Sequence, residues 1–210
     1  MGLAIIQPTA NQTPDATLGG LAVTGITNTG HGETSTSSSA NALAPFGNAS
    51  DSDSKSARWF GLSNVSGQRT SVRLKFSWSA SGSCDANGGQ GGSDPQIDGT
   101  ASSSCSFGVE YSLNGGSSWT THVSDSAGAF SFGPISDNND FDNNGLADIA
   151  LSNNQDVSLI QVRVLYSTSC DADAGNGSES ATANADVTAS ISGIQVEVVT
   201  QDQTHLLVMM

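Results

Sequence analysis

The chain has 210 residues and a formal net charge of −14, from six basic and twenty acidic residues. So few Lys and Arg side chains exclude a protein that binds nucleic acid by neutralising phosphates, and an anionic membrane surface would repel the chain. One residue in six is Ser, and hydrophobic residues make up 36% of the chain, below the usual globular share of about 45–50%.

Apolar and polar residues alternate in short segments, and no window has the periodicity of an amphipathic helix. In chain order, the expected strands are 3–6, 21–26, 59–62, 70–78, 107–113, 119–123, 129–132, 149–151, 159–166, 187–191 and 194–199. The clearest is 70–78, where four apolar residues from Val72 to Trp78 alternate with polar ones. Short strands separated by turn residues predict an all-β fold, an antiparallel β-sandwich or jelly-roll-like domain.

The first part of the chain differs in composition from the rest. Residues 28–57 are small, polar and low in sequence complexity, which is typical of a flexible linker. The alternative is an extended arm that orders on a neighbouring subunit, with Ala42–Phe46 as a small apolar anchor. We therefore expect an N-terminal arm over 1–56, a β-sandwich over 57–200 and an apolar C-terminal tail over 201–210.

The N-terminus lacks the features of a classical signal peptide. It has no basic region, and the apolar run Leu3–Ile6 is too short for a signal-peptide core. No segment approaches the ~18 apolar residues of a membrane span. The sequence predicts neither membrane insertion nor export by the classical route.

The strongest chemical pattern is an Asp/Asn-rich segment at 137–149. Within it, D-x-[DN]-x-[DN]-G-x-x-D spacing would present oxygen ligands around a tight turn at Gly145, as a hard cation such as Ca²⁺ requires. The segment DFDNNGLADI resembles the calcium loops of dockerins, thrombospondin type 3 repeats and FG-GAP repeats. The resemblance implies a structural Ca²⁺ held by the side chains of Asp140, Asp142, Asn144 and Asp148 and the carbonyl of Leu146.

A second pattern lies at 111–120, where S-x-[DN]-x-G-x-[ST]-W spacing runs from Ser112 to Trp119. It resembles the Asp-box hairpin of sialidases and other β proteins, and that resemblance implies a structural role. Asn114-Gly115 is also a strong hairpin signal in its own right. A single copy predicts a β-hairpin and not a sialidase propeller.

The three cysteines leave several pairings open. Cys84 and Cys105 flank a Gly/Ser-rich segment and could close it, whereas Cys84 and Cys170 have similar surroundings and could join two loops. An odd number leaves at least one thiol unpaired in a monomer.

The sequence gives no indication of catalysis. His31, His122 and His205 stand apart from any recognisable catalytic motif, and neither G-x-S-x-G nor H-E-x-x-H occurs. We expect a protein that is not an enzyme.

Two classes of function are consistent with these features of the sequence. The first is a structural or adhesive subunit of a multi-copy extracellular or virion assembly, such as a tail, decoration or appendage protein, with homo-oligomers or other subunits as partners. The segment 185–200 resembles, in general character, the closing strands of phage tail-associated sandwich domains. The alternative is a calcium-stapled carbohydrate-binding module that binds a host-surface glycan, with Trp59, Trp119 and Tyr111 as candidate stacking residues.

Overall fold

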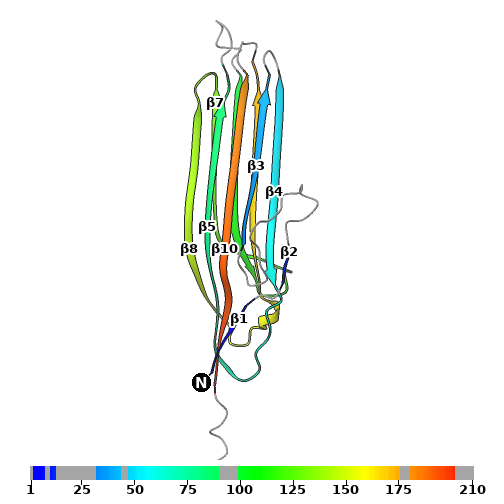
Figure 1. The fold of residues 1–210 in the computed structure, drawn as a ribbon, viewed down its shortest axis with the longest axis vertical. Coiled ribbons are helices and arrows are strands. Elements are labelled where there is room, and N and C mark those ends of the chain that lie inside the picture. The colour runs from blue at the N-terminus through cyan, green and yellow to red at the C-terminus, as the bar shows by residue number, and fades with distance from the viewer. Residues whose placement is uncertain are drawn as a thin grey trace, which may run out of the picture.

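The computed structural model describes residues 2–7, 10–12, 32–43, 47–89, 99–175 and 180–201. They form a narrow sandwich of two antiparallel sheets whose long strands run along the long axis of the molecule (Figure 1). The all-β sandwich expected from the sequence is confirmed. Within the described residues, no helix reaches the length and hydropathy that a membrane span requires.

Each sheet contains five strands. Sheet A has the order β1-β10-β5-β8, with β3 also paired to β10, and sheet B has the order β2-β4-β9-β6-β7. Sheet A consists of β1 (Gly2–Ile6), β3 (Gly32–Ala42), β5 (Arg69–Asn87), β8 (Asp137–Leu151) and β10 (Ala181–Thr200). Sheet B consists of β2 (Ala10–Gln12), β4 (Asn48–Phe60), β6 (Thr100–Ser112), β7 (Thr120–Phe132) and β9 (Gln161–Asp173).

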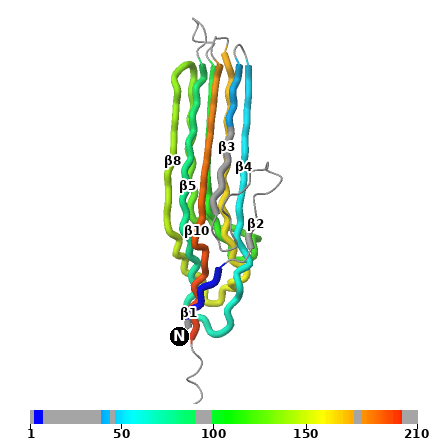
Figure 2. The backbone as a smooth tube through the Cα atoms, in the orientation of Figure 1, coloured from blue at the N-terminus to red at the C-terminus, as the bar shows by residue number. Residues whose placement is uncertain are grey.

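Most connections pass from one sheet to the other. Consecutive strands belong to different sheets at every step except β6 to β7, which pair directly as a hairpin. A short 3-10 helix, η3 (Val157–Leu159), precedes β9. β5 and β10 pair along nearly their whole length, from Asn87 opposite Thr182 to Arg69 opposite Thr200. The backbone tube in Figure 2 shows how this pair extends from one end of the molecule to the other.

The core changes in character along the long axis. At the end where β1 lies, it is built from large residues, including Trp59, Leu74 and Val198. The other half is filled almost entirely by alanine and cysteine, namely Ala40, Ala42, Ala80, Cys84, Ala86, Ala101, Cys105, Ala127, Ala129, Cys170, Ala172, Ala174, Ala181, Ala183, Ala185 and Ala189. We call these the large-residue half and the alanine-rich half. Side chains this small fill the alanine-rich half only if its two sheets approach closely.

An aromatic layer lies between the two halves. The rings of Phe107 and Phe141 stack at 5.4 Å between centroids, and Trp78 lies 5.7 Å from Phe107. Glycines make room for these rings. A Cβ on Gly145 would lie 2.9 Å from Trp78, and a Cβ on Gly82 would overlap the ring of Phe141. β5 and β8 therefore each place one aromatic ring against a glycine of the other strand.

Several strands are much longer than the sequence predicts. The expected strand 70–78 continues to Asn87, because Ala80, Gly82, Cys84 and Ala86 continue the inward alternation after Trp78. The same holds at the start of β6 and β10 and at the end of β9, where small residues occupy the inward positions. The expected strand 21–26 lies outside the described residues.

The strand pairing also corrects the expectation of an N-terminal arm, because parts of this segment are strands of the two sheets. Of residues 1–56, those at 2–6, 10–12, 32–42 and 48–56 belong to strands, and the expected boundary at 57 falls inside β4. β3 pairs with β10, and β4 pairs with β9. β3 lacks large apolar residues, but Ala40 and Ala42 fit the closely packed core, and tertiary context here outweighs low strand propensity. The tail residues 202–210 lie outside the described residues.

Gly82 provides a test of this packing. We predict that Gly82→Ala destabilises the protein by about 1–3 kcal/mol, because the added Cβ would overlap Phe141 and lie 2.8 Å from the Cys105 sulfur. Urea unfolding followed by circular dichroism measures the change.

Gly108→Ala is the matched control in β6. Its Cβ would meet nothing closer than 3.8 Å, so stability should be unchanged or rise by up to about 1 kcal/mol. Equal effects of the two substitutions would contradict the interlocked packing.

Candidate functional site

The predicted calcium ligands lie on a strand and not in a loop. Residues 137–151 form β8, an edge strand of sheet A that pairs with β5 over its whole length. The five predicted ligands occupy alternate positions on its exposed side: Asp140, Asp142, Asn144, Leu146 and Asp148. This corrects the expected loop geometry.

Strand geometry keeps these ligands apart. Alternate residues of a strand are separated by about 6.6–6.8 Å, whereas oxygens bound to one Ca²⁺ lie about 2.3–2.6 Å from it. A single ion cannot reach all five positions. Among the described residues, no group of three or more His, Cys, Asp and Glu side chains is arranged to hold a metal ion. The residues do not fit the expected calcium loop, and calcium binding stays a prediction.

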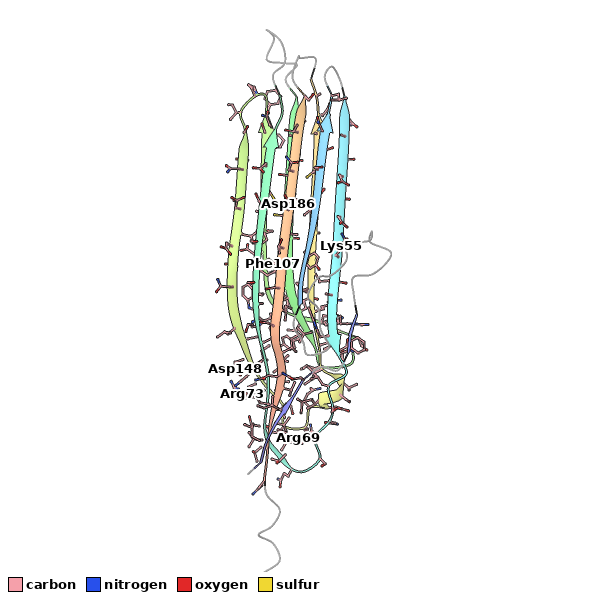
Figure 3. The ribbon with its side chains drawn as sticks, viewed as in Figure 1. Lys55, Arg69, Arg73, Phe107, Asp148 and Asp186 are labelled. Atoms are coloured by element: carbon pink, nitrogen blue, oxygen red, sulfur yellow. The ribbon has the colours of Figure 1, made fainter. Side chains whose placement is uncertain are left out.

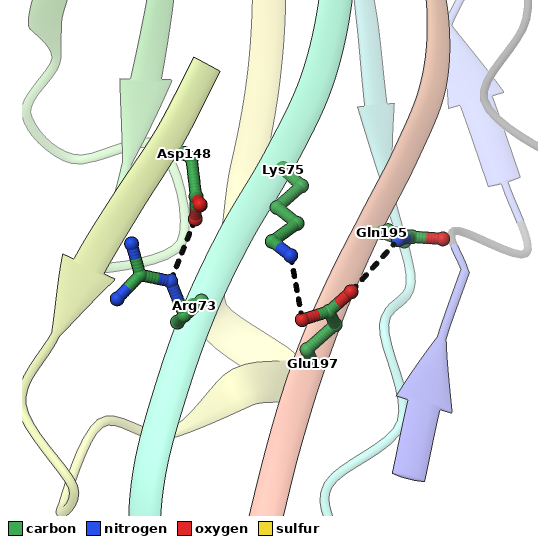
Figure 4. A network of polar contacts seen from close by, with 5 residues as sticks. All are labelled: Arg73, Lys75, Asp148, Gln195 and Glu197. Carbon is green, nitrogen blue, oxygen red and sulfur yellow. Dashed lines mark hydrogen bonds and ion pairs between the residues drawn. The ribbon is translucent and has the colours of Figure 1, made fainter. Parts of the chain in front are cut away.

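Asp148 already has a partner. Arg73 on β5 donates its Nε–H to Asp148 Oδ1 at 2.7 Å (Figure 4). This hydrogen bond, together with the positive charge, holds the pKa of Asp148 below its usual value. Next to it, Lys75 pairs with Glu197 at 2.8 Å. These contacts link β8, β5 and β10 across the outer face of sheet A.

Charge is distributed unevenly along the molecule. Lys55 lies near the middle, whereas Arg69, Arg73 and Asp148 lie in the large-residue half (Figure 3). The outer face of sheet A in the alanine-rich half carries Asp140, Asp142 and Asp186 beside Ser and Thr side chains, around shallow depressions. Acidic side chains dominate this half, because Arg58, Arg69, Arg73, Lys75 and Arg163 all belong to the other half.

The Asp-box pattern forms the predicted hairpin between β6 and β7. The buried Ser112 hydroxyl accepts hydrogen bonds from the Gly116 amide at 2.9 Å and the Asn114 amide at 3.3 Å. Asn114 Oδ1 accepts from the Ser118 amide at 2.9 Å. Gly115 and Gly116 have φ of 74° and 88°, which non-glycine residues rarely adopt. Side chains of the motif therefore accept the hydrogen bonds that the backbone amides of its own turn donate.

Trp119 supports this hairpin. The Arg163 guanidinium lies 4.0 Å from the centre of the Trp119 ring and also donates to Glu110 Oε2 at 2.6 Å. The cation covers one ring face and is fixed by the carboxylate, as expected of a partly desolvated cation–π contact. Gly116 lies beside the ring, and a Cβ there would lie 3.5 Å from Trp119, an ordinary van der Waals contact.

The other candidate stacking residues do not form a platform with Trp119. Trp59 is 1% exposed and belongs to the core, so its prediction as a ligand contact is wrong. Tyr111 is half-buried and packs against the same core. His122 contacts Phe76 edge-on at 5.4 Å, and burial lowers its pKa. These side chains contribute to packing.

The three cysteines are close together in the alanine-rich half. All three are buried, and none is joined in a disulfide. Cys84 of sheet A and Cys105 of sheet B have their sulfur atoms 2.9 Å apart. The first sequence-based pairing placed Cys84 and Cys105 on either side of a loop, and the second placed Cys84 and Cys170 in two loops, but all three cysteines lie within strands.

Two features of the structure are not predicted from the sequence. Lys55 is almost fully buried in β4 and pairs with Asp53 two residues earlier. Phe130, Phe132 and Ile135 are more than half exposed around the β7–β8 turn. The alternation of β7 indicates that the two Phe residues share one face, but only the strand pairing shows that this face points outward.

The comparisons with known proteins show only remote likenesses. No protein-family model matches the sequence, and the curated proteins give no match either. Among solved structures, an empty virus-like particle of cowpea mosaic virus is similar at 13% identity and a TM-score of 0.25, over 82% of this chain and 85% of that one. The carbohydrate-binding module TmCBM61, in complex with β-1,4-galactotriose, is similar at 10% identity and a TM-score of 0.18, over 78% of this chain and 86% of that one. Because these TM-scores are so low, no property of these proteins is assigned to this chain.

The Ser112 hydroxyl should be important for stability. We predict that Ser112→Ala costs about 1–3 kcal/mol, because it leaves two turn amides without their acceptor in a buried position. Ser117→Ala, at an exposed position of the same turn, should change stability by less than about 0.5 kcal/mol. Urea unfolding of both variants checks the difference, and similar stabilities would contradict the assigned role.

The strand geometry of β8 also makes a prediction about calcium. We expect Asp142→Ala to shift the melting temperature by the same amount in calcium as in EDTA, because the five expected ligands do not converge. Differential scanning fluorimetry of wild type and variant in both buffers measures the shifts. A loss confined to calcium would contradict this expectation and support the metal site predicted from the sequence.

Proposed function

We propose that this chain is a non-enzymatic structural or adhesive subunit of a multi-copy extracellular or virion assembly. The observation that carries the proposal is the placement of exposed apolar side chains on the rod-shaped sandwich. Such side chains are costly on a soluble surface when they gather in patches, and they commonly mark contacts with other proteins.

These side chains gather at the two ends of the molecule. At the end carrying the β7–β8 turn, the exposed apolar residues are Leu43, Phe130, Phe132 and Ile135. At the opposite end, where β1 lies (Figure 1), they are Leu3, Ile5 and Leu159. Among the described residues, only Leu146 is a strongly exposed large apolar residue along the length of β8. The sandwich therefore has apolar ends.

The sides of the rod have the opposite character. The outward positions of β5 and β10 in the alanine-rich half are Ser, Thr, Asn and Asp, and the whole chain carries a net charge of −14. Like charges on neighbouring faces would oppose lateral association, whereas small apolar patches at the ends can be buried without bringing the acidic faces together. This arrangement favours end-to-end contacts between copies.

Such a contact joins two different patches. An association of unlike surfaces extends into an open chain of subunits unless its rotation closes a ring. Repetition of this kind is what a tail, decoration or appendage protein requires. The carbohydrate-binding alternative has less support, because Trp59 is buried and the Trp119 ring is covered on one face by Arg163.

The experiment is size-exclusion chromatography with light scattering on the full chain over a range of concentrations. We predict masses that are multiples of the chain mass and rise with concentration. The double variant Phe130→Ser, Phe132→Ser should shift the distribution to the monomer, because it removes the apolar patch at one end. Leu146→Ser, which removes an even more exposed apolar residue from the side, should leave assembly unchanged.

Two outcomes would contradict the proposal. A wild-type monomer at every concentration would remove the basis for self-assembly, and a glycan-array screen would then test the carbohydrate-binding alternative. Equal loss of assembly in the end and side variants would show that the contacts do not depend on the ends.

A further inference from the structure

Two buried sulfur atoms from opposite sheets face each other in the alanine-rich half. Cys84 Sγ on β5 and Cys105 Sγ on β6 lie 2.9 Å apart, so the contact joins sheet A to sheet B. Unbonded sulfur atoms pack at greater separations than this. A disulfide bond measures about 2.05 Å, so the two atoms need to approach by less than about 1 Å to bond.

We propose that Cys84 and Cys105 form a disulfide that joins the two sheets in the alanine-rich half, and that Cys170 takes no part in this bond. The bond would close a loop of about 20 residues that includes the connection between β5 and β6. It requires an oxidant, which we identify by class as a small-molecule disulfide such as oxidised glutathione.

The position of Cys170 excludes it as the partner of Cys105. Both lie in sheet B on paired strands, but Cys105 is opposite Thr168 and Cys170 is opposite Ser103. The two cysteines are therefore diagonal neighbours. Diagonal residues of an antiparallel pair are about 7–8 Å apart, beyond the usual Cα separation of about 4.4–6.8 Å across a disulfide.

The chemistry balances as an exchange reaction. A cysteine thiolate attacks one sulfur of oxidised glutathione, forming a mixed disulfide and releasing one glutathione. The second cysteine thiolate then attacks the protein sulfur of the mixed disulfide and releases the second glutathione. Two protein thiols become one disulfide, one oxidised glutathione becomes two reduced molecules, and the two thiol protons end on those molecules.

The surroundings indicate when the exchange takes place. Burial raises the pKa of Cys84 to about 12 and that of Cys170 to about 11, and it also raises the pKa of Cys105. Because the thiolate is the reacting form, these thiols react slowly once the sandwich has closed. The bond should therefore form during folding, before the sheets pack, and should afterwards resist reductants in solution.

Such a bond would stabilise the part of the core with the least apolar surface. The core of this half includes Ala80, Ala86, Ala101 and Ala127, which bury far less area than the Val, Leu and Phe residues of the other half. A cross-link also reduces the conformational entropy of the unfolded chain. The proposal does not depend on the assembly function proposed above.

The test compares full-length protein refolded in a glutathione redox buffer with protein kept in reductant. Each sample is denatured, alkylated with iodoacetamide, and cut with a protease that cleaves at Asp94 and Asp98, between the two cysteines. We expect the peptides containing Cys84 and Cys105 to remain joined until reduction, with only Cys170 alkylated. The oxidised protein should melt about 5–10 °C higher than the reduced protein.

Variants identify the pair. Cys84→Ser and Cys105→Ser should abolish the joined peptides and the redox-dependent shift in melting temperature, whereas Cys170→Ser, at an equally buried position, should keep both. Alkylation of all three cysteines in refolded wild type would overturn the proposal. Joined peptides containing Cys170 would overturn the assigned pairing. If a variant fails to fold, the joined peptides and the redox-dependent melting temperature of the wild type still decide the question.

Discussion

The rest of the structure depends on how closely the two sheets approach in the alanine-rich half. Most inward positions there carry Ala, Gly, Ser or Cys, with Val187 and Thr168 as larger exceptions, so the sheets contact each other mainly through very short side chains. Each such residue contributes little hydrophobic burial, and the packing works only if the strands are long and in register. The long pairing between β5 and β10 meets this requirement. The glycine–aromatic contacts at Gly82 and Gly145, between β5 and β8, lie where the alanine-rich half joins the large-residue half.

This architecture explains the outline of the proposed function. In a rod whose strands run from end to end, the strand ends and turns lie at two remote ends, and the exposed large apolar side chains of the described residues other than Leu146 lie there. Its long sides present Ser, Thr, Asn and Asp, and the acidic residues of the alanine-rich half have almost no basic partners there. The basic residues are instead paired in the large-residue half, as Arg73 with Asp148 and Arg163 with Glu110.

The sequence predicted the fold class well and the lengths of the strands poorly. The sequence predicts a strand at 72–78 because large apolar residues alternate there with polar ones. Residues 80–86 continue the same strand, but their inward side chains are too small to give a hydrophobic signal. The calcium prediction was affected in the same way. Gly145 resembles a turn glycine, yet in β8 its missing side chain accommodates Trp78. The Asp-box hairpin was predictable because its bonds are local. The Cys84–Cys105 contact was not, because it depends on the approach of two sheets.

Native-state hydrogen exchange with mass spectrometry tests most directly whether the alanine-rich half is a cooperative part of the sandwich. The packing predicts that amides at 80–86 and 183–189 exchange as slowly as those at 72–76 and 194–198, because both halves open only with the whole domain. Fast exchange in the alanine-rich half, with protection limited to the large-residue half, would contradict this account. It would show that small side chains alone do not hold the sheets together.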